Sequence, residues 1–293
     1  MVKTKIIEES DEKIAILLSD TDRAFVNAIR RTLMSDTPKM AIDTVRFEMG
    51  TIEQDGEVWE TNGPLPDEVV AQRLAMIPIP TKHDEFHFQG NCPTCAELVV
   101  EDRGCPQCTM IYTCKVFGTE DGRIVTAGDM SFLGAGGSIS EKFHDIPITR
   151  LSRGQMIEFY ATAIMGRGRD HAKWSPVCGT TFTPRQVGVI NKPRKAKILW
   201  DLNLTITAKD FSSGRLEDIG KVAQLIDDLH HVGEGTEESR EFKDAITLEE
   251  VPGEFILSFE SDGSMTARVA FQKAIQELSG RFGELEEDLV TVL

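Results

Sequence analysis

Long apolar segments are missing from this sequence of 293 residues, and none approaches the roughly 18 consecutive apolar residues of a membrane-spanning helix. The first residues, MVKTKIIEESDEKIAILL, place charges where a signal peptide needs a continuous apolar stretch. The sequence therefore predicts a soluble cytoplasmic protein without a membrane partner.

Basic residues are scarce, because 32 Lys and Arg stand against 48 Asp and Glu, which gives a formal net charge of -16. A free-standing nucleic-acid binder needs clustered Lys and Arg that release counterions from the phosphate backbone. Direct sequence-specific DNA binding is therefore not expected, and the partners should be proteins. The hydrophobic content of 40% is enough for a sizeable globular core.

Catalytic motifs are absent as well. Asp20 and Asp22 precede a helical pattern, where carboxylates usually cap the helix. The glycine-rich residues 134–137 lack the Lys and Ser or Thr of a phosphate-binding loop and indicate a hairpin or flexible loop. No acidic triplet for two-metal phosphoryl transfer and no nucleophile, base and acid arrangement with defensible geometry is present.

The cysteines are few but clustered. Four of the six form Cys92-x2-Cys95-x9-Cys105-x2-Cys108, and each pair encloses a proline that favours a tight turn. This array predicts a metal site with four thiolates, since disulfide scaffolds spread their cysteines through small secreted domains. Zinc and an iron-sulfur cluster both accept four cysteines, and reduced thiols left from a lost site are the remaining alternative.

Other potential ligands have simpler explanations. Cys114 and Cys178 lie outside the array and are expected to be structural, and His83 and His87 are expected to be surface loop residues. Neither CxxC pair stands at a helix N-terminus after a strand, so a thioredoxin-like redox role is not indicated.

Apolar periodicity and turn residues predict a mixed chain with a mostly β middle region. Pro66 opens one of the predicted helices, and Pro38 stops another. The predicted strands are residues 14–18, 41–49, 108–117, 156–164, 197–208 and 254–260, and the predicted helices are residues 23–34, 67–74, 216–229 and 266–289.

The last predicted helix carries an apolar seam with a 3.5-residue period, which is typical of a helix that packs against a partner helix. The seam residues are Phe271, Ile275, Leu278, Phe282, Leu285 and Leu289.

Residues 166–176, GRGRDHAKWSP, gather basic residues around Trp174. Such a segment could contact nucleic acid, but in an acidic chain it is as typical of a protein-protein hot spot, where Arg and Trp are enriched.

This segment and the earlier FVNAIRRTLMSDTPKMAID (25–43) resemble the family of archaeal RNA polymerase D subunits and their eukaryotic counterpart, the third-largest subunit of RNA polymerase II. The resemblance extends to PLPDEVVAQRLAMIPIP (64–80), CPQCTMIYTCKV (105–116), IPITRLSRGQMIEFYATA (146–163) and the terminal helix. It therefore touches most of the chain.

The resemblance implies an α+β fold similar to the amino-terminal domain of the bacterial alpha subunit. A discontinuous dimerisation domain would comprise residues 1–46 and 184–293, and a β-rich domain with the cysteine-rich loop 92–108 would be inserted at residues 47–183. Residues 209–252, which include FSSGRLEDIGKVAQLIDDL, would form a degenerate ferredoxin-like insertion within the dimerisation domain.

In function, the resemblance implies a non-catalytic assembly subunit. It would pair with a small L-type subunit, and the heterodimer would be the platform for the large catalytic subunits and other small subunits. The residues expected to contact the L-type subunit are Phe25, Ile29, Leu33, Phe271, Ile275, Leu278, Phe282, Leu285 and Leu289. Those expected to dock the large subunits are Arg30, Arg31, Arg167, Arg169, Lys173 and Trp174.

The cofactor expectation departs from many archaeal relatives, whose ferredoxin-like insertion holds an iron-sulfur cluster. Residues 178–251 contain a single cysteine, too few for a cluster. Cys92, Cys95, Cys105 and Cys108 instead resemble the zinc loop of the eukaryotic counterpart, with a differently spaced first pair, so structural zinc is expected.

Two other functions compete with the assembly role. A zinc-dependent hydrolase needs an open coordination position, which four cysteines would close. A free-standing zinc-stabilised protein-protein adaptor would find no polymerase partner.

Overall fold

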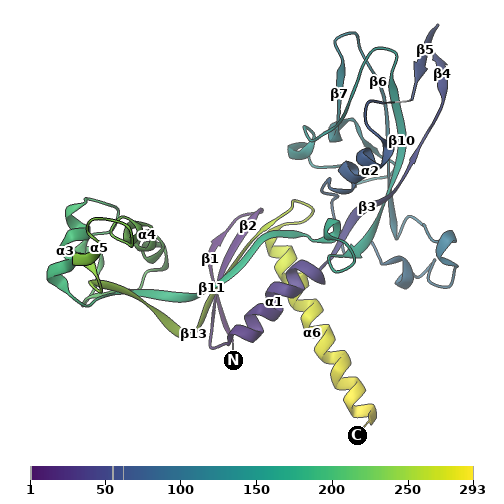
Figure 1. Cartoon of the computed structure of the whole chain (residues 1–293). Helices are drawn as coiled ribbons and strands as arrows, with labels where there is room; N and C mark the ends of the chain where they lie inside the picture. Colours follow the sequence, from purple (N-terminus) through teal and green to yellow (C-terminus); the bar gives the residue numbers. More distant parts are fainter. Residues whose placement is uncertain (1, 55, 62, 293) are drawn as a thin grey trace. The chain divides into compact units, whose positions relative to one another are not determined.

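The computed structural model describes residues 2–54, 56–61 and 63–292, so the outer limits of the expected domains, residues 1 and 293, lie outside it. Figure 1 labels the main helices and strands of the chain. The chain divides into two compact units. The first unit contains Met1–Ile7, Ala15–Asn27 and Thr181–Ser258, and the second contains Glu8–Ile14, Ala28–Thr180 and Phe259–Leu293. Antiparallel sheets and separate helices make the fold α+β, as expected.

A five-stranded sheet has the strand order β1-β2-β13-β11-β12. Its strands are β1 (Lys3–Glu9), β2 (Lys13–Ser19), β11 (Val177–Ile190), β12 (Arg215–Leu216) and β13 (Ile246–Ser261). The strands predicted over residues 14–18 and 254–260 are confirmed, and the second is longer than its alternating pattern indicated.

Helices α3 (Pro193–Asp201), α4 (Ile219–His230) and α5 (Ser239–Phe242) lie wholly within the first unit. The helix predicted over residues 216–229 is confirmed as α4, which begins where the Asp218 side chain accepts a hydrogen bond from the Lys221 backbone N–H.

The strand predicted over residues 197–208 is wrong. Pro193 occupies the first turn of α3, where its fixed φ favours a helix. Leu199 is buried in the core around this helix, and Ile198 and Trp200 pack against the same core. The alternating residues that suggested a strand continue past the end of α3, where Leu204 and Ile206 pack on the same core from a segment without regular structure.

The second unit contains a four-stranded antiparallel sheet with the order β3-β10-β6-β8. These strands are β3 (Pro38–Phe47), β10 (Met156–Arg167), β6 (Thr109–Phe117) and β8 (Ser131–Phe132). They confirm the strands predicted over residues 41–49, 108–117 and 156–164. Phe159 of β10 lies between Phe47 and Cys114 of its two neighbours and is fully buried.

Smaller elements complete the second unit. Strands β4 (Thr51–Gln54) and β5 (Glu57–Glu60) pair with each other, as do β7 (Arg123–Thr126) and β9 (Pro147–Leu151). Helix α2 (Asp67–Ala75) confirms the prediction for residues 67–74. Among the described residues, short 3-10 helices are η1 (Gln89–Asn91), η2 (Val100–Asp102), η3 (Ala127–Asp129), η4 (Glu141–Phe143) and η5 (Ala172–Trp174), with η6 (Ala208–Asp210) in the first unit.

Two helices match the predicted partner-binding segments, α1 (Arg23–Ser35) and α6 (Ala267–Val292). Asp22 caps α1 by accepting the Phe25 backbone N–H at 2.8 Å, as its position before the helix indicated. None of the helices in the described part of the chain is long and apolar enough to cross a membrane.

Candidate metal centre and assembly surfaces

Two tight turns bring the four clustered cysteines together. In the first turn the backbone N–H groups of Cys95 and Ala96 donate to the Cys92 carbonyl, at 3.1 and 2.9 Å. The second turn repeats this pattern, since Cys108 and Thr109 donate to the Cys105 carbonyl at 3.0 and 3.1 Å. Each turn therefore aims two thiols to the same side, and β6 begins directly after the second turn.

The sulfur positions fit a tetrahedral metal ion. The Sγ atoms of Cys92 and Cys105 are 3.5 Å apart, those of Cys105 and Cys108 are 3.8 Å apart, and those of Cys95 and Cys108 are 3.9 Å apart. All four sulfurs lie within 4.8 Å of one another. Zinc-sulfur bonds of about 2.3 Å in a tetrahedron separate the sulfurs by about 3.8 Å, whereas a disulfide needs about 2.05 Å. The four cysteines could thus hold a metal ion, and the site is compatible with zinc.

The surroundings of the thiols favour a bound cation. Hydrogen bonds from the backbone of Gly104 and Cys105 lower the pKa of Cys95 to about 7. Burial raises the pKa of Cys108, and the nearby thiols of Cys105, Cys95 and Cys92 raise it further. Four thiolates so close together need a cation to offset their repulsion and desolvation.

The remaining candidate ligands lie outside this cluster. Cys114 is buried in the core of the second unit, where burial raises the pKa of its thiol to about 12, while Cys178 is exposed. His87 is exposed, as predicted, but His83 is half-buried, and its Nε2 lies 2.9 Å from the Pro38 carbonyl oxygen. Burial lowers the pKa of His83.

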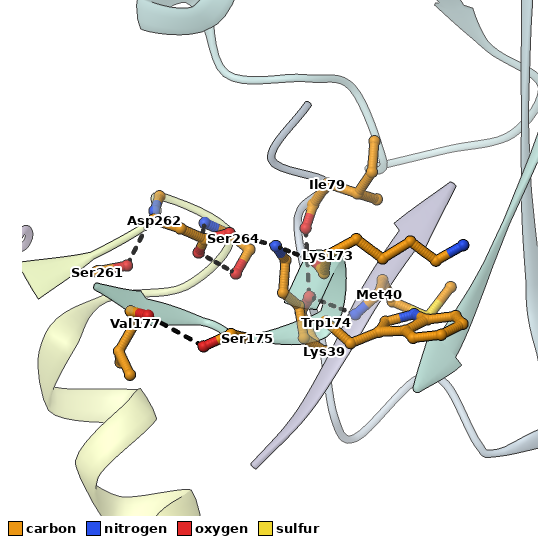
Figure 2. A network of polar contacts seen from close by, with 12 residues as sticks. Lys39, Met40, Ile79, Lys173, Trp174, Ser175, Val177, Ser261, Asp262 and Ser264 are labelled. Atoms are coloured by element: carbon orange, nitrogen blue, oxygen red, sulfur yellow. Dashed lines mark hydrogen bonds and ion pairs between the residues drawn. The ribbon is translucent and has the colours of Figure 1, made fainter. Parts of the chain in front are cut away.

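A buried polar network joins four segments of the second unit (Figure 2). The ammonium group of Lys39, whose side chain is 5% exposed, pairs with Asp262 and donates to the Lys173 carbonyl at 2.8 Å. Lys173 in turn pairs with Asp43 at 2.7 Å. Breaking a buried ion pair by removing one partner typically costs about 3–5 kcal/mol, so this network fixes the start of β3 to the turn between β13 and α6.

Backbone groups extend the same network. Thr81 accepts the Met40 backbone N–H at 3.0 Å, and its own backbone N–H donates to the Ser264 carbonyl at 2.9 Å. The Ser264 hydroxyl donates to Asp262 at 2.7 Å. The turn that precedes α6 is therefore fixed by a hydrogen bond from Thr81 and an ion pair with Lys39.

The glycines of the GRGR segment permit close approaches within the second unit. A Cβ atom on Gly166 would lie 2.3 Å from the ring of Trp174, whose indole N–H donates to the Ile164 carbonyl at 3.1 Å. A Cβ atom on Gly168 would lie 2.0 Å from the Met34 carbonyl oxygen. Both positions require glycine because a side chain would displace the neighbouring ring or backbone.

Asp36, which is buried, gathers arginines from separate parts of the second unit. Arg281 of α6 reaches both of its carboxylate oxygens, at 2.6 and 2.7 Å, and this contact raises the pKa of Arg281. Arg167 donates to the Asp36 carbonyl oxygen and pairs with Glu277 of α6 at 2.5 Å. The guanidinium group of Arg169 forms a longer ion pair with the Asp36 carboxylate, at 3.7 Å.

The predicted docking residues therefore divide into two groups. Lys173 is buried, and Arg167 and Trp174 are partly buried and engaged within the chain, so their first role is internal. Arg31 and Arg169 are exposed, and Arg30 is half-buried, with a hydrogen bond to the Met34 sulfur at 3.4 Å. Arg31 and Arg169 are therefore the exposed members of the set, and Arg169 also lies within ion-pair distance of Asp36.

The predicted seam of α6 is mostly uncovered. Phe282 is 60% exposed and Leu285 54%, Ile275 and Leu289 are also exposed, and Phe271 and Leu278 are half-buried. The residues of α1 require a correction, because Ile29 and Leu33 are buried within the chain and only Phe25 is half-exposed. Their periodicity marks an apolar helix face, and that face is already covered.

Lys39, Asp262 and Asp36 were missed by sequence reasoning. One signal was available, since Lys39 stands between apolar residues at the start of β3, in the part of the strand that is buried. A buried lysine needs a carboxylate or carbonyl partner. The sequence contains no local indication that the partner is Asp262.

Residues 15–282 match the family described as RNA polymerase Rpb3/Rpb11 dimerisation domain. The chain is similar to DNA-directed RNA polymerase subunit Rpo3 of Picrophilus torridus, with 33% identity over 97% of this chain and 98% of that protein. The protein of the same name from Thermoplasma volcanium is 30% identical over 98% of this chain and 99% of its own length. DNA-directed RNA polymerase II subunit rpb3 of Dictyostelium discoideum is 33% identical over 65% of this chain and 60% of that protein.

Proposed function

Because this chain belongs to the RNA polymerase Rpb3/Rpb11 dimerisation-domain family, we propose that it is the non-catalytic D-type assembly subunit of a cytoplasmic DNA-directed RNA polymerase. It pairs with an L-type subunit, and the heterodimer is the platform on which the large catalytic subunits and other small subunits assemble. The observation that carries this proposal is the exposed apolar seam of α6 in a chain of this family.

The proposed pairing residues are the seam residues of α6 and, on α1, Phe25. An isolated helix that exposes Phe282, Leu285 and Leu289 along one face is stabilised when that face is buried by a partner. The docking surface for the large subunits includes Arg31 and Arg169, which are exposed.

We propose a domain organisation in which the two larger sheets belong mainly to two different domains. Strands from both ends of the chain, residues 1–46 and 184–293, share the five-stranded sheet, which supports a discontinuous dimerisation domain. Most strands of the four-stranded sheet lie in the proposed inserted domain, residues 47–183. Residues 209–252 are the proposed degenerate ferredoxin-like insertion, and they contain no cysteine.

The proposed cofactor is one structural zinc ion held by Cys92, Cys95, Cys105 and Cys108. Zinc would tie the two turns together and supply no chemistry, since four thiolates fill a tetrahedral site. This closed ligand set argues against a zinc-dependent hydrolase. The alternative of a free-standing zinc-stabilised adaptor keeps the same metal site but has no polymerase partner.

Co-expression with an L-type subunit tests the pairing. We expect the chain alone to self-associate or to be unstable, because its seam is exposed, and the two chains together to elute from gel filtration as a one-to-one heterodimer. Failure of the two purified chains to form a complex, with each chain folded, would favour the free-standing adaptor.

A further inference from the structure

The loop between the two cysteine turns carries three consecutive exposed apolar residues. Leu98 is 44% exposed, Val99 63% and Val100 72%. Single exposed apolar side chains are normal on protein surfaces, but an uninterrupted exposed run destabilises the isolated chain and usually marks a contact. We call these three residues the apolar knob.

The knob is held by the backbone of its own loop. The backbone N–H of Leu98 donates to the Cys95 carbonyl at 3.0 Å, and the backbone N–H of Asp102 donates to the Val99 carbonyl at 3.0 Å. Arg103 adds two hydrogen bonds from its side chain, to the Leu98 carbonyl at 3.0 Å and to the Ala96 carbonyl at 3.1 Å. These bonds anchor the knob to the first cysteine turn, so its side chains are presented in a preorganised arrangement.

Acidic residues surround the knob in sequence. Glu97 precedes it, Glu101 and Asp102 follow it, and all three are exposed. An acidic rim repels nucleic acid, an anionic membrane surface and the equally acidic rim of a second copy of this chain. It matches an apolar pocket whose edge carries Lys and Arg.

We propose that the apolar knob inserts into an apolar pocket, rimmed by basic residues, on a large catalytic subunit of the polymerase. The contact rests on the proposed function, but it is separate from the seam of α6 and from the exposed arginines. Apolar burial supplies the affinity, and the acidic rim selects and orients the partner.

The test uses the heterodimer of this chain with the L-type subunit, and it measures the binding of purified large subunits by titration. The double substitution Val99→Ser and Val100→Ser should weaken binding at least tenfold, with zinc content and pairing unchanged, and Glu97→Lys with Glu101→Lys should weaken it and reduce its dependence on salt. Ile124→Ser is the matched control, because Ile124 is 56% exposed on β7 without exposed apolar neighbours in sequence, and it should leave binding unchanged.

A photo-crosslinker at position 99 in the assembled enzyme identifies the contact. Crosslinking to a large subunit beside Lys or Arg residues supports the proposal, whereas crosslinking to DNA overturns it. Equal binding by the wild type and the Val99, Val100 double variant overturns the proposed contact of the apolar knob and leaves the proposed function standing. If the wild-type heterodimer binds no large subunit, the knob and the proposed function are both wrong.

Discussion

Substitution of Phe282 and Leu285 by aspartate should abolish pairing with the L-type subunit. Both side chains are more than half exposed on α6, and a helix interface would bury them. Each such anchor typically contributes about 2 kcal/mol or more at an interface, and the buried carboxylates add a desolvation cost. We expect the dissociation constant to rise roughly a thousandfold, which corresponds to about 4 kcal/mol.

Analytical ultracentrifugation of the purified pair measures this effect. Glu287→Ala is the control, because Glu287 is exposed on the same helix but lies outside the seam. A double variant that still forms a heterodimer with wild-type affinity would show that the seam is not the interface.

The second large effect should follow the loss of the metal ligands. Replacing Cys105 and Cys108 by serine removes both thiol ligands that the second turn supplies. The zinc content should fall from about one ion per chain to about zero. Binding of structural zinc by small peptides corresponds to about 10–16 kcal/mol, so the loop around residues 92–108 should lose its fold and become sensitive to proteases.

Elemental analysis after anaerobic purification, together with limited proteolysis, decides this prediction. Cys178→Ser is the control and should keep its zinc, since Cys178 is exposed and remote from the cluster in sequence. Zinc that is unaffected by the double substitution, or stoichiometric iron and sulfide in the wild type, would contradict the assignment.

The metal centre was predictable because its geometry is local. Two CxxC pairs with an internal proline form tight turns almost independently of the rest of the fold, and the four sulfurs indeed converge. Most strands and helices were predictable for the same reason, since period-2 and period-3.6 patterns report which face is covered. The prediction for segment 197–208 failed because its apolar residues pack on one core partly from α3 and partly, through Leu204 and Ile206, from the irregular segment after it.

The surfaces were less predictable, because an apolar pattern does not say what covers it. Ile29 and Leu33 follow the same helical spacing as the seam of α6, yet the chain itself buries them while Phe282 and Leu285 remain exposed. The basic and aromatic segment around Trp174 was similarly ambiguous. Its Lys173 pairs with Asp43, a contact between distant parts of the sequence that no local pattern encodes.

The most direct test of the central claim is reconstitution of the polymerase from separate subunits with and without this chain. Promoter-independent RNA synthesis is the measured quantity. We expect RNA synthesis to require this chain paired with the L-type subunit, and we expect the heterodimer alone to synthesise no RNA. Full assembly and synthesis in the absence of this chain, or synthesis by the heterodimer alone, would contradict its role as a non-catalytic platform.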